Sequence, residues 1–162
     1  MVGYWLISPY DAKDKRGKSF EEIWNYDLSN GTIALGASSL HNSNIQDLSL
    51  LSHEELEEEI SRLNPSWGPR TIKERARSAW ELYHLVKEGD FVLAKKGKTA
   101  ILAVGKVIKK EGRVSFCDKR RGLERTGNNY NPYPNFLNVK WYKNSNINFD
   151  EHVFLIKRFG EL

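Results

Sequence analysis

Two helix-start signals lie close together near the middle of the chain, and they limit the folds that it can adopt. Ser52-His53-Glu54-Glu55 and Thr71-Ile72-Lys73-Glu74 both match the capping box, in which the first and fourth side chains bond each other's backbone N–H groups. Apolar residues recur at helical spacing after each signal. We therefore expect two adjacent helices, separated by the Pro-containing segment 64–69.

Strand-like segments flank this helical region on both sides. The candidate strands cover residues 3–8, 32–36, 91–94, 100–104, 113–117, 136–142 and 152–156. This order predicts an α+β fold, in the form of a small bent β-barrel of about six strands with helices inserted between the second and third strands. A chain of 162 residues has the size of one domain, so we expect a single domain over residues 1–162.

Two further segments are interpreted from their composition. Residues 20–24 indicate a short helix or the approach to a strand, and Asn30-Gly31 after them is a turn signal. The segment between the strands at 113–117 and 136–142 is rich in Asn, Gly and Pro, so we expect a long loop there.

The positive charge of the chain is concentrated in two places. Lys and Arg total 25 against 21 Asp and Glu, which gives a net charge of +4 and an isoelectric point near 9.1. Residues 106–125 hold eight basic residues against three acidic ones, and a second basic cluster, which includes Lys13, follows the first strand. Aromatic residues make up 12% of the chain, and we expect some of them to provide stacking surfaces beside these basic segments. This combination is typical of nucleic-acid-binding proteins.

The sequence contains no recognisable catalytic constellation. Its four histidines follow no metal-ligand spacing, and its one cysteine, Cys117, excludes a disulfide within the chain. We therefore expect no enzymatic activity, no cofactor and no metal. No apolar run approaches the roughly 18 residues of a membrane span, and the start lacks the basic region of a signal peptide. A cytoplasmic location without a membrane partner follows as the expectation.

Four segments of the chain carry a family pattern. The first is the opening strand with its Ser-containing end (4–9), and the second is a Trp-bearing segment with a small-residue strand (23–36). The third is a Gly-Asp turn with its hairpin partner (86–107), and the fourth is a late strand (139–141). Together they resemble the YTH and EVE domains of the PUA-like superfamily, and most closely the amino-terminal specificity domain of McrB-type restriction subunits. The resemblance covers nearly the whole chain, although Ala103 stands where the family commonly has a glycine.

The resemblance implies that the chain binds DNA and reads a methylated base, N6-methyladenine, by flipping it into an aromatic cage. By position, Trp24 matches the first cage wall and Asn25 the polar residue after it, while Ser8 and Asp11 fall in the loop that contacts the base edge. The second wall would come from the segment after the central hairpin, or from the loop between the two helices. The candidates for this wall are Tyr133, Tyr130, Phe116 and Trp67.

The basic clusters predict contacts to the phosphate backbone. The six side chains assigned to this role are Lys15, Arg16, Lys18, Lys119, Arg120 and Arg121. The resemblance further implies that the domain targets a modification-dependent restriction system, with a motor or nuclease subunit as partner, and that the chain is a domain excised from a larger protein.

Several alternatives stay open at the level of sequence. Trp24 is either a cage wall or a core residue, and the run 119–121 is either a phosphate contact or a solvated loop. Trp5, Trp80 and Trp141 are interpreted as core residues. An RNA-binding PUA-like protein that reads a modified or structured RNA explains the same basic and aromatic pattern. A small enzyme or ligand-binding barrel is the third interpretation, and it would require paired ionisable groups in a deep pocket.

Overall fold

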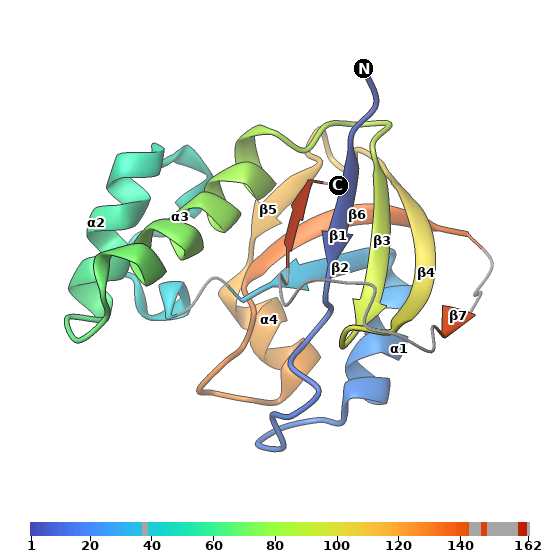
Figure 1. Cartoon of the computed structure of the whole chain (residues 1–162), viewed down its shortest axis with the longest axis horizontal. Coiled ribbons are helices and arrows are strands. Elements are labelled where there is room, and N and C mark those ends of the chain that lie inside the picture. The colour runs from blue at the N-terminus through green and yellow to red at the C-terminus, as the bar shows by residue number, and fades with distance from the viewer. Residues whose placement is uncertain (37–38, 143–146, 149–158, 162) are drawn as a thin grey trace.

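A strongly curled mixed sheet forms the centre of the molecule (Figure 1). The computed structural model describes residues 1–36, 39–142, 147–148 and 159–161. In chain order the described elements are β1 (Tyr4–Ile7), α1 (Phe20–Asn30), β2 (Thr32–Leu35), the 3-10 turns η1 (Leu40–Asn42) and η2 (Leu48–Leu50), α2 (His53–Leu63), α3 (Pro69–His84), β3 (Phe91–Lys96), β4 (Ala100–Val107), β5 (Ser115–Cys117), α4 (Lys119–Thr126), β6 (Asn135–Trp141), β7 (Ile147–Asn148) and β8 (Phe159–Glu161).

Five strands, in the order β2-β6-β4-β3-β1, make up a half-barrel, and β8 extends it beside β1. The β1–β3 pair is parallel and the other pairs of this path are antiparallel, so the sheet is mixed. Two short strands lie off the path, β5 on β6 and β7 on β4. The predicted α+β class is confirmed, and α2 and α3 lie between the second and third strands as expected. The predicted strand at 152–156 lies outside the described residues.

Helix α1 is longer than the sequence interpretation allowed. Ser19 and Glu22 form a capping box at its start, and Gly31 ends it in the left-handed conformation with φ of 61°. The turn signal Asn30-Gly31 is therefore a helix end followed at once by β2. Ile23 and Trp24 on one face of the helix are buried in the core.

Helix α3 begins earlier than predicted. Its N-cap is Gly68 and Pro69 occupies the first turn, so the capping box expected at Thr71 is not used. The capping box at Ser52, in contrast, is present with both of its hydrogen bonds, and it starts α2 as predicted. The two helices pack together at one side of the sheet (Figure 1).

The expected loop after residue 117 contains a helix. Asp118 caps α4 by accepting a hydrogen bond from the Arg121 backbone N–H (2.8 Å), and Gly127 ends the helix with φ of 59°. The tribasic run 119–121 thus forms the first turn of a helix, and this fixes the directions of its three side chains. Within the described ranges, none of the helices combines the length and the apolar character that a membrane span requires.

Candidate nucleic-acid interface

Two loops meet beside the end of β1 and are held together by hydrogen bonds. The first, residues 8–19, joins β1 to α1, and the second, residues 127–134, joins α4 to β6. The Tyr10 hydroxyl donates to the Asn131 carbonyl (3.1 Å), and the Asn128 side-chain amide donates to both Tyr10 Oη (2.7 Å) and Asp14 Oδ2 (3.0 Å). Burial raises the pKa of Tyr10 to about 12, so its hydroxyl keeps its proton at neutral pH.

A buried ion pair fixes the base of the first loop. The Arg125 guanidinium binds both carboxylate oxygens of Asp27 (2.8 and 2.5 Å) and also donates to the Pro9 carbonyl (2.8 Å). Both charged side chains are completely buried. The pair therefore joins α1, α4 and the segment after β1. Removing either partner would leave an unpaired buried charge and strongly destabilise the protein.

The first loop presents a cation against an aromatic ring. Arg16 folds back onto Asp14 with Nε and Nη2 (3.1 and 3.0 Å), and its guanidinium lies 5.2 Å from the ring centre of Tyr130. These hydrogen bonds lower the pKa of Asp14 to about 2. Tyr130 is 74% exposed, so the part of its ring that the Arg16 guanidinium leaves open offers a face on which a base can stack.

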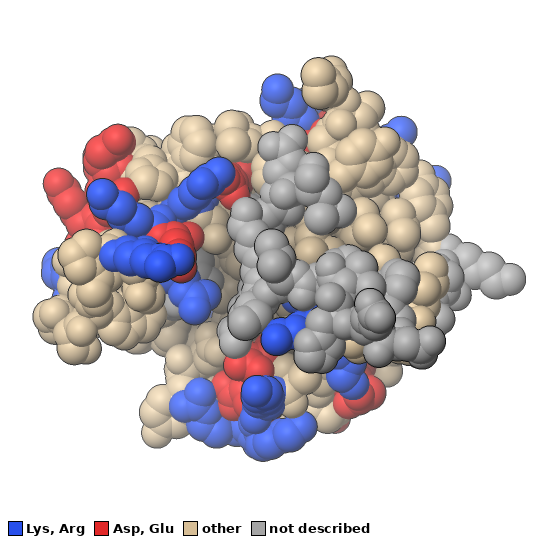
Figure 2. Space-filling view, viewed as in Figure 1, with Lys and Arg blue, Asp and Glu red and all other residues tan. Residues whose placement is uncertain are grey.

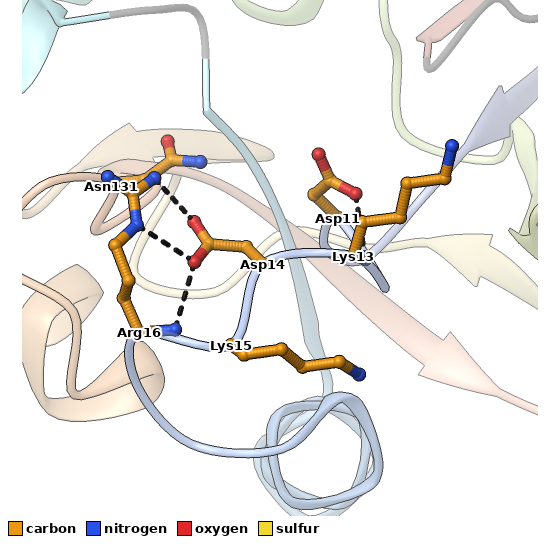
Figure 3. Close-up of a pocket in the computed structure, with 6 residues that line it drawn as sticks. All are labelled: Asp11, Lys13, Asp14, Lys15, Arg16 and Asn131. Carbon is orange, nitrogen blue, oxygen red and sulfur yellow. Dashed lines mark hydrogen bonds and ion pairs between the residues drawn. The ribbon is translucent and has the colours of Figure 1, made fainter.

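Basic side chains gather around this point. An open hollow of about 390 Å³ is lined by Asp11, Lys13, Asp14, Lys15, Arg16 and Asn131 (Figure 3). Figure 3 shows Lys13 and Lys15 extending away from the loop, while Arg16 curves over Asp14. Lys and Arg side chains also gather around several carboxylates at the lower end of the space-filling view in Figure 2. We call the hollow, together with Lys18, Arg120 and Tyr130, the basic loop surface.

The structure connects the two predicted basic clusters only in part. Lys18 donates from Nζ to the Glu124 carbonyl (2.7 Å) and from its backbone N–H to the Thr126 carbonyl (2.8 Å), so the first loop lies against α4. On α4 itself, Arg120 has an 85% exposed side chain beside Glu124 (3.4 Å). Arg120 is therefore the member of the tribasic run that a phosphate group can reach.

The other two members of that run have partners inside the protein. Lys119 donates to the carbonyls of Ser43 and Ile45. Arg121 donates to the Tyr26 hydroxyl (3.0 Å), and its guanidinium lies about 5 Å from the rings of Phe116 and Phe136. Both side chains hold α4 against its neighbours, and their predicted role in binding the phosphate backbone stays a prediction.

The predicted cage residues do not form an open cage in this structure. Trp24 is 7% exposed and its ring meets that of Trp141 edge-on at 5.0 Å, so the core interpretation describes it. Tyr133 is buried against Tyr10, with ring centres 4.6 Å apart. Asn25 is exposed on α1, and Trp67 is half-buried in the turn between α2 and α3. Figure 1 shows this turn on the far side of α2 and α3 from the two loops.

Asp11 lines the hollow, and Ser8 lies at the start of the same loop. The Ser8 hydroxyl donates to the Tyr10 carbonyl (3.0 Å), and the Asp11 carboxylate accepts from the Lys13 backbone N–H (3.0 Å). Sequence reasoning missed Tyr10, Asn128 and Asn131. The one available signal was the Asn-rich stretch around Tyr130, which directly follows a basic segment.

The described residues contain no cluster of three or more His, Cys, Asp or Glu side chains that could hold a metal ion. The hollow at the first loop is shallow and open, and its carboxylates are already engaged by N–H groups. The arrangement can therefore bind a charged or planar group at the surface, and it offers no pair of ionisable groups set for proton transfer.

The fold and this surface define an α+β protein with a curled mixed half-barrel sheet and a basic, tyrosine-bearing loop cluster at one end. A family model matches residues 10–158, which is most of the chain, and the chain belongs to that family, DUF8426, a domain of unknown function. No curated protein and no solved structure matches the chain.

Proposed function

We propose that this chain is a nucleic-acid-binding module and that the basic loop surface is its interface. The observation that carries the proposal is the arrangement of Lys13, Lys15 and Arg16 around an open hollow with Tyr130 exposed at its edge. Cations placed beside a solvent-exposed ring match the two parts of a nucleotide, because phosphate attracts the cations and the base stacks on the ring.

The favoured ligand is DNA that carries a methylated base, N6-methyladenine, within a modification-dependent restriction system. This part of the proposal rests on the resemblance to YTH and EVE domains of the PUA-like superfamily, and the curled mixed half-barrel supports it at the level of architecture. Since Trp24 is buried, a flipped base would stack on the part of the Tyr130 ring that Arg16 leaves open. The restriction assignment also predicts a motor or nuclease subunit as partner.

A panel of labelled oligonucleotides tests the proposal by fluorescence anisotropy. It contains duplex DNA with N6-methyladenine, the same duplex without the methyl group, and RNA of the same sequence. We expect salt-dependent binding with the tightest affinity for methylated DNA. Equal affinity for both duplexes would contradict the base preference, and tighter binding of RNA would favour the RNA-binding alternative.

Tyr130 provides the site-specific part of the same experiment. Tyr130→Ala removes a stacking face worth about 1–3 kcal/mol and should weaken binding, whereas Tyr130→Phe should retain it. Because Tyr130 is exposed, neither substitution is expected to change the melting temperature by more than a few degrees. Unchanged affinity of Tyr130→Ala would exclude the loop as the base-contacting surface.

A further inference from the structure

A row of aromatic and basic side chains crosses the sheet at a place distinct from the basic loop surface. Tyr4 is in register with Phe91, Phe91 with Lys106, and Lys106 with Lys140, so these four residues lie on one face of the sheet. Tyr142 follows Lys140 by two residues and therefore lies on the same face. We call these five residues the aromatic row.

The rings of the aromatic row are close together and partly open to solvent. The Tyr4 and Phe91 rings are stacked, with centres 5.7 Å apart and planes inclined by 13°, and the Phe91 and Tyr142 ring centres are 6.5 Å apart. Tyr4 is 50% exposed and Tyr142 is 45% exposed. The neighbouring residues Trp5 and Val92 point to the other face and are buried in the core. An exposed group of contiguous aromatic rings is typical of an interaction site.

The lysines of the aromatic row have no acidic partner in the described part of the chain. Lys106 and Lys140 are both exposed, and neither forms an ion pair there. The carboxylates just before β3 are engaged elsewhere. Glu88 pairs with Lys109 (3.5 Å), and buried Asp90 accepts hydrogen bonds from the Gly3 backbone (2.8 Å) and the Trp5 indole (2.9 Å). Among the described residues, no carboxylate pairs with the two lysines of the aromatic row, and their positive charge favours an anionic partner.

We propose that the aromatic row binds single-stranded nucleic acid, with two or three unpaired bases on Tyr4, Phe91 and Tyr142 and their phosphates near Lys106 and Lys140. The row places two neighbouring rings on β1 and β3 beside two lysines on β4 and β6, so stacking faces and cations lie next to each other as bases and phosphates do along a strand. Sheet aromatics are a known platform for unpaired bases. A duplex is a poor match, because its bases are stacked on each other and present no free face. This inference rests on the proposed function for its class of ligand, but it concerns a second surface.

The test compares a short labelled oligothymidine with a duplex of equal length, again by fluorescence anisotropy. In the double variant Tyr4→Ala/Tyr142→Ala, single-strand affinity should fall at least about fivefold for each tyrosine, while duplex affinity stays within twofold of wild type. The matched control Tyr4→Phe/Tyr142→Phe keeps both rings and should bind the single strand like wild type. Both tyrosines are half-exposed, and melting temperatures verify that each variant is folded.

The outcomes separate this inference from the proposed function. Duplex binding by a wild-type protein that ignores oligothymidine would overturn the inference and leave the proposed function intact. Full single-strand affinity in the Ala variant would also overturn it. Sedimentation provides one more check: if wild type is a dimer that the Ala variant converts to a monomer, the aromatic row is a contact between copies of the chain and the inference is wrong. The inference is supported if wild type is a monomer and single-strand affinity falls in the Ala variant but not in the Phe control.

Discussion

The indole of Trp24 lies against the core because of the helix that carries it. On α1, Ile23 and Trp24 point to the buried face, while Asn25 points to solvent. A tryptophan next to a polar residue is compatible with a binding site or with an amphipathic helix, and the difference depends on whether the segment is helical. Once the capping box of Ser19 and Glu22 starts a helix, the core position follows.

Trp24→Ala should destabilise the protein by about 3–5 kcal/mol, because it empties a buried site that also supports the Trp141 ring. Urea unfolding followed by far-ultraviolet circular dichroism measures the change in the free energy of unfolding. Trp67→Ala is the matched control, since that tryptophan is only half-buried and should cost much less. A Trp24→Ala protein of wild-type stability would contradict the core assignment.

Asp14 links stability to pH. Its pKa is about 2 in the folded protein against an ordinary value of 3.8, so the ionised carboxylate stabilises the native state above pH 4 and this contribution disappears as the pH falls through 2. At neutral pH we expect Asp14→Asn to lower the free energy of unfolding by at most about 2 kcal/mol. About half of this difference from wild type should disappear by pH 3.

Urea titrations of wild type and Asp14→Asn between pH 7 and pH 3 measure this difference. A gap between the two proteins that stays constant over the whole range would show that Asp14 is not held by Arg16 in solution. The amide variant keeps the size of the side chain, so the comparison isolates its charge.

At the scale of elements, α4 depends on one close approach. A Cβ atom at Gly122 would lie 2.6 Å from the Pro132 carbonyl oxygen and 2.8 Å from that of Tyr133. The helix therefore packs directly against the loop that carries Tyr130. This contact also places the basic loop surface, because α4 supplies Arg120 and the loop supplies Tyr130 and Asn131.

Gly122→Ala should destabilise the protein by about 1–3 kcal/mol, although alanine is the better helix former by about 1 kcal/mol. The melting temperature of the variant relative to wild type shows directly whether the substitution stabilises or destabilises the protein. The exposed residue Leu123 is the control, because Leu123→Ala changes the same helix without a backbone clash. A stabilised Gly122→Ala protein would mean that α4 does not contact the 132–133 backbone.

The helices and strands differ in how well they could be predicted from the sequence. The start of α2 and the hairpin of β3 and β4 were predicted, because a capping box and a short turn are local signals. Helices α1 and α4 carry equally local signals, in Ser19 with Glu22 and in Asp118 with Gly127, which were not interpreted as helix ends. Because a loop was expected there, the contacts of Lys119 and Arg121 with neighbouring elements were not anticipated.

At the scale of the whole molecule, the α+β class, the place of α2 and α3 and several residues of the site could be predicted, whereas the contacts that hold the site together could not. The contacts that build it join residues more than 90 positions apart, such as Asp27 with Arg125 and Tyr10 with Asn128. No local pattern encodes such pairs, because they depend on how β1, α1 and α4 pack. The basic clusters were found from composition, but which cations stay open to solvent depends on these tertiary contacts.

The salt dependence of duplex binding tests the central claim most directly. For wild type, the logarithm of the association constant should fall linearly with the logarithm of salt concentration, and Lys13→Ala/Lys15→Ala should lower the slope by about 0.9 for each phosphate that the variant no longer neutralises. The control Arg70→Ala/Lys73→Ala removes two exposed charges from α3 and should leave the slope unchanged. Equal slopes for the loop variant and wild type, or a slope near zero for wild type, would contradict the assignment of the basic loop surface as a nucleic-acid interface.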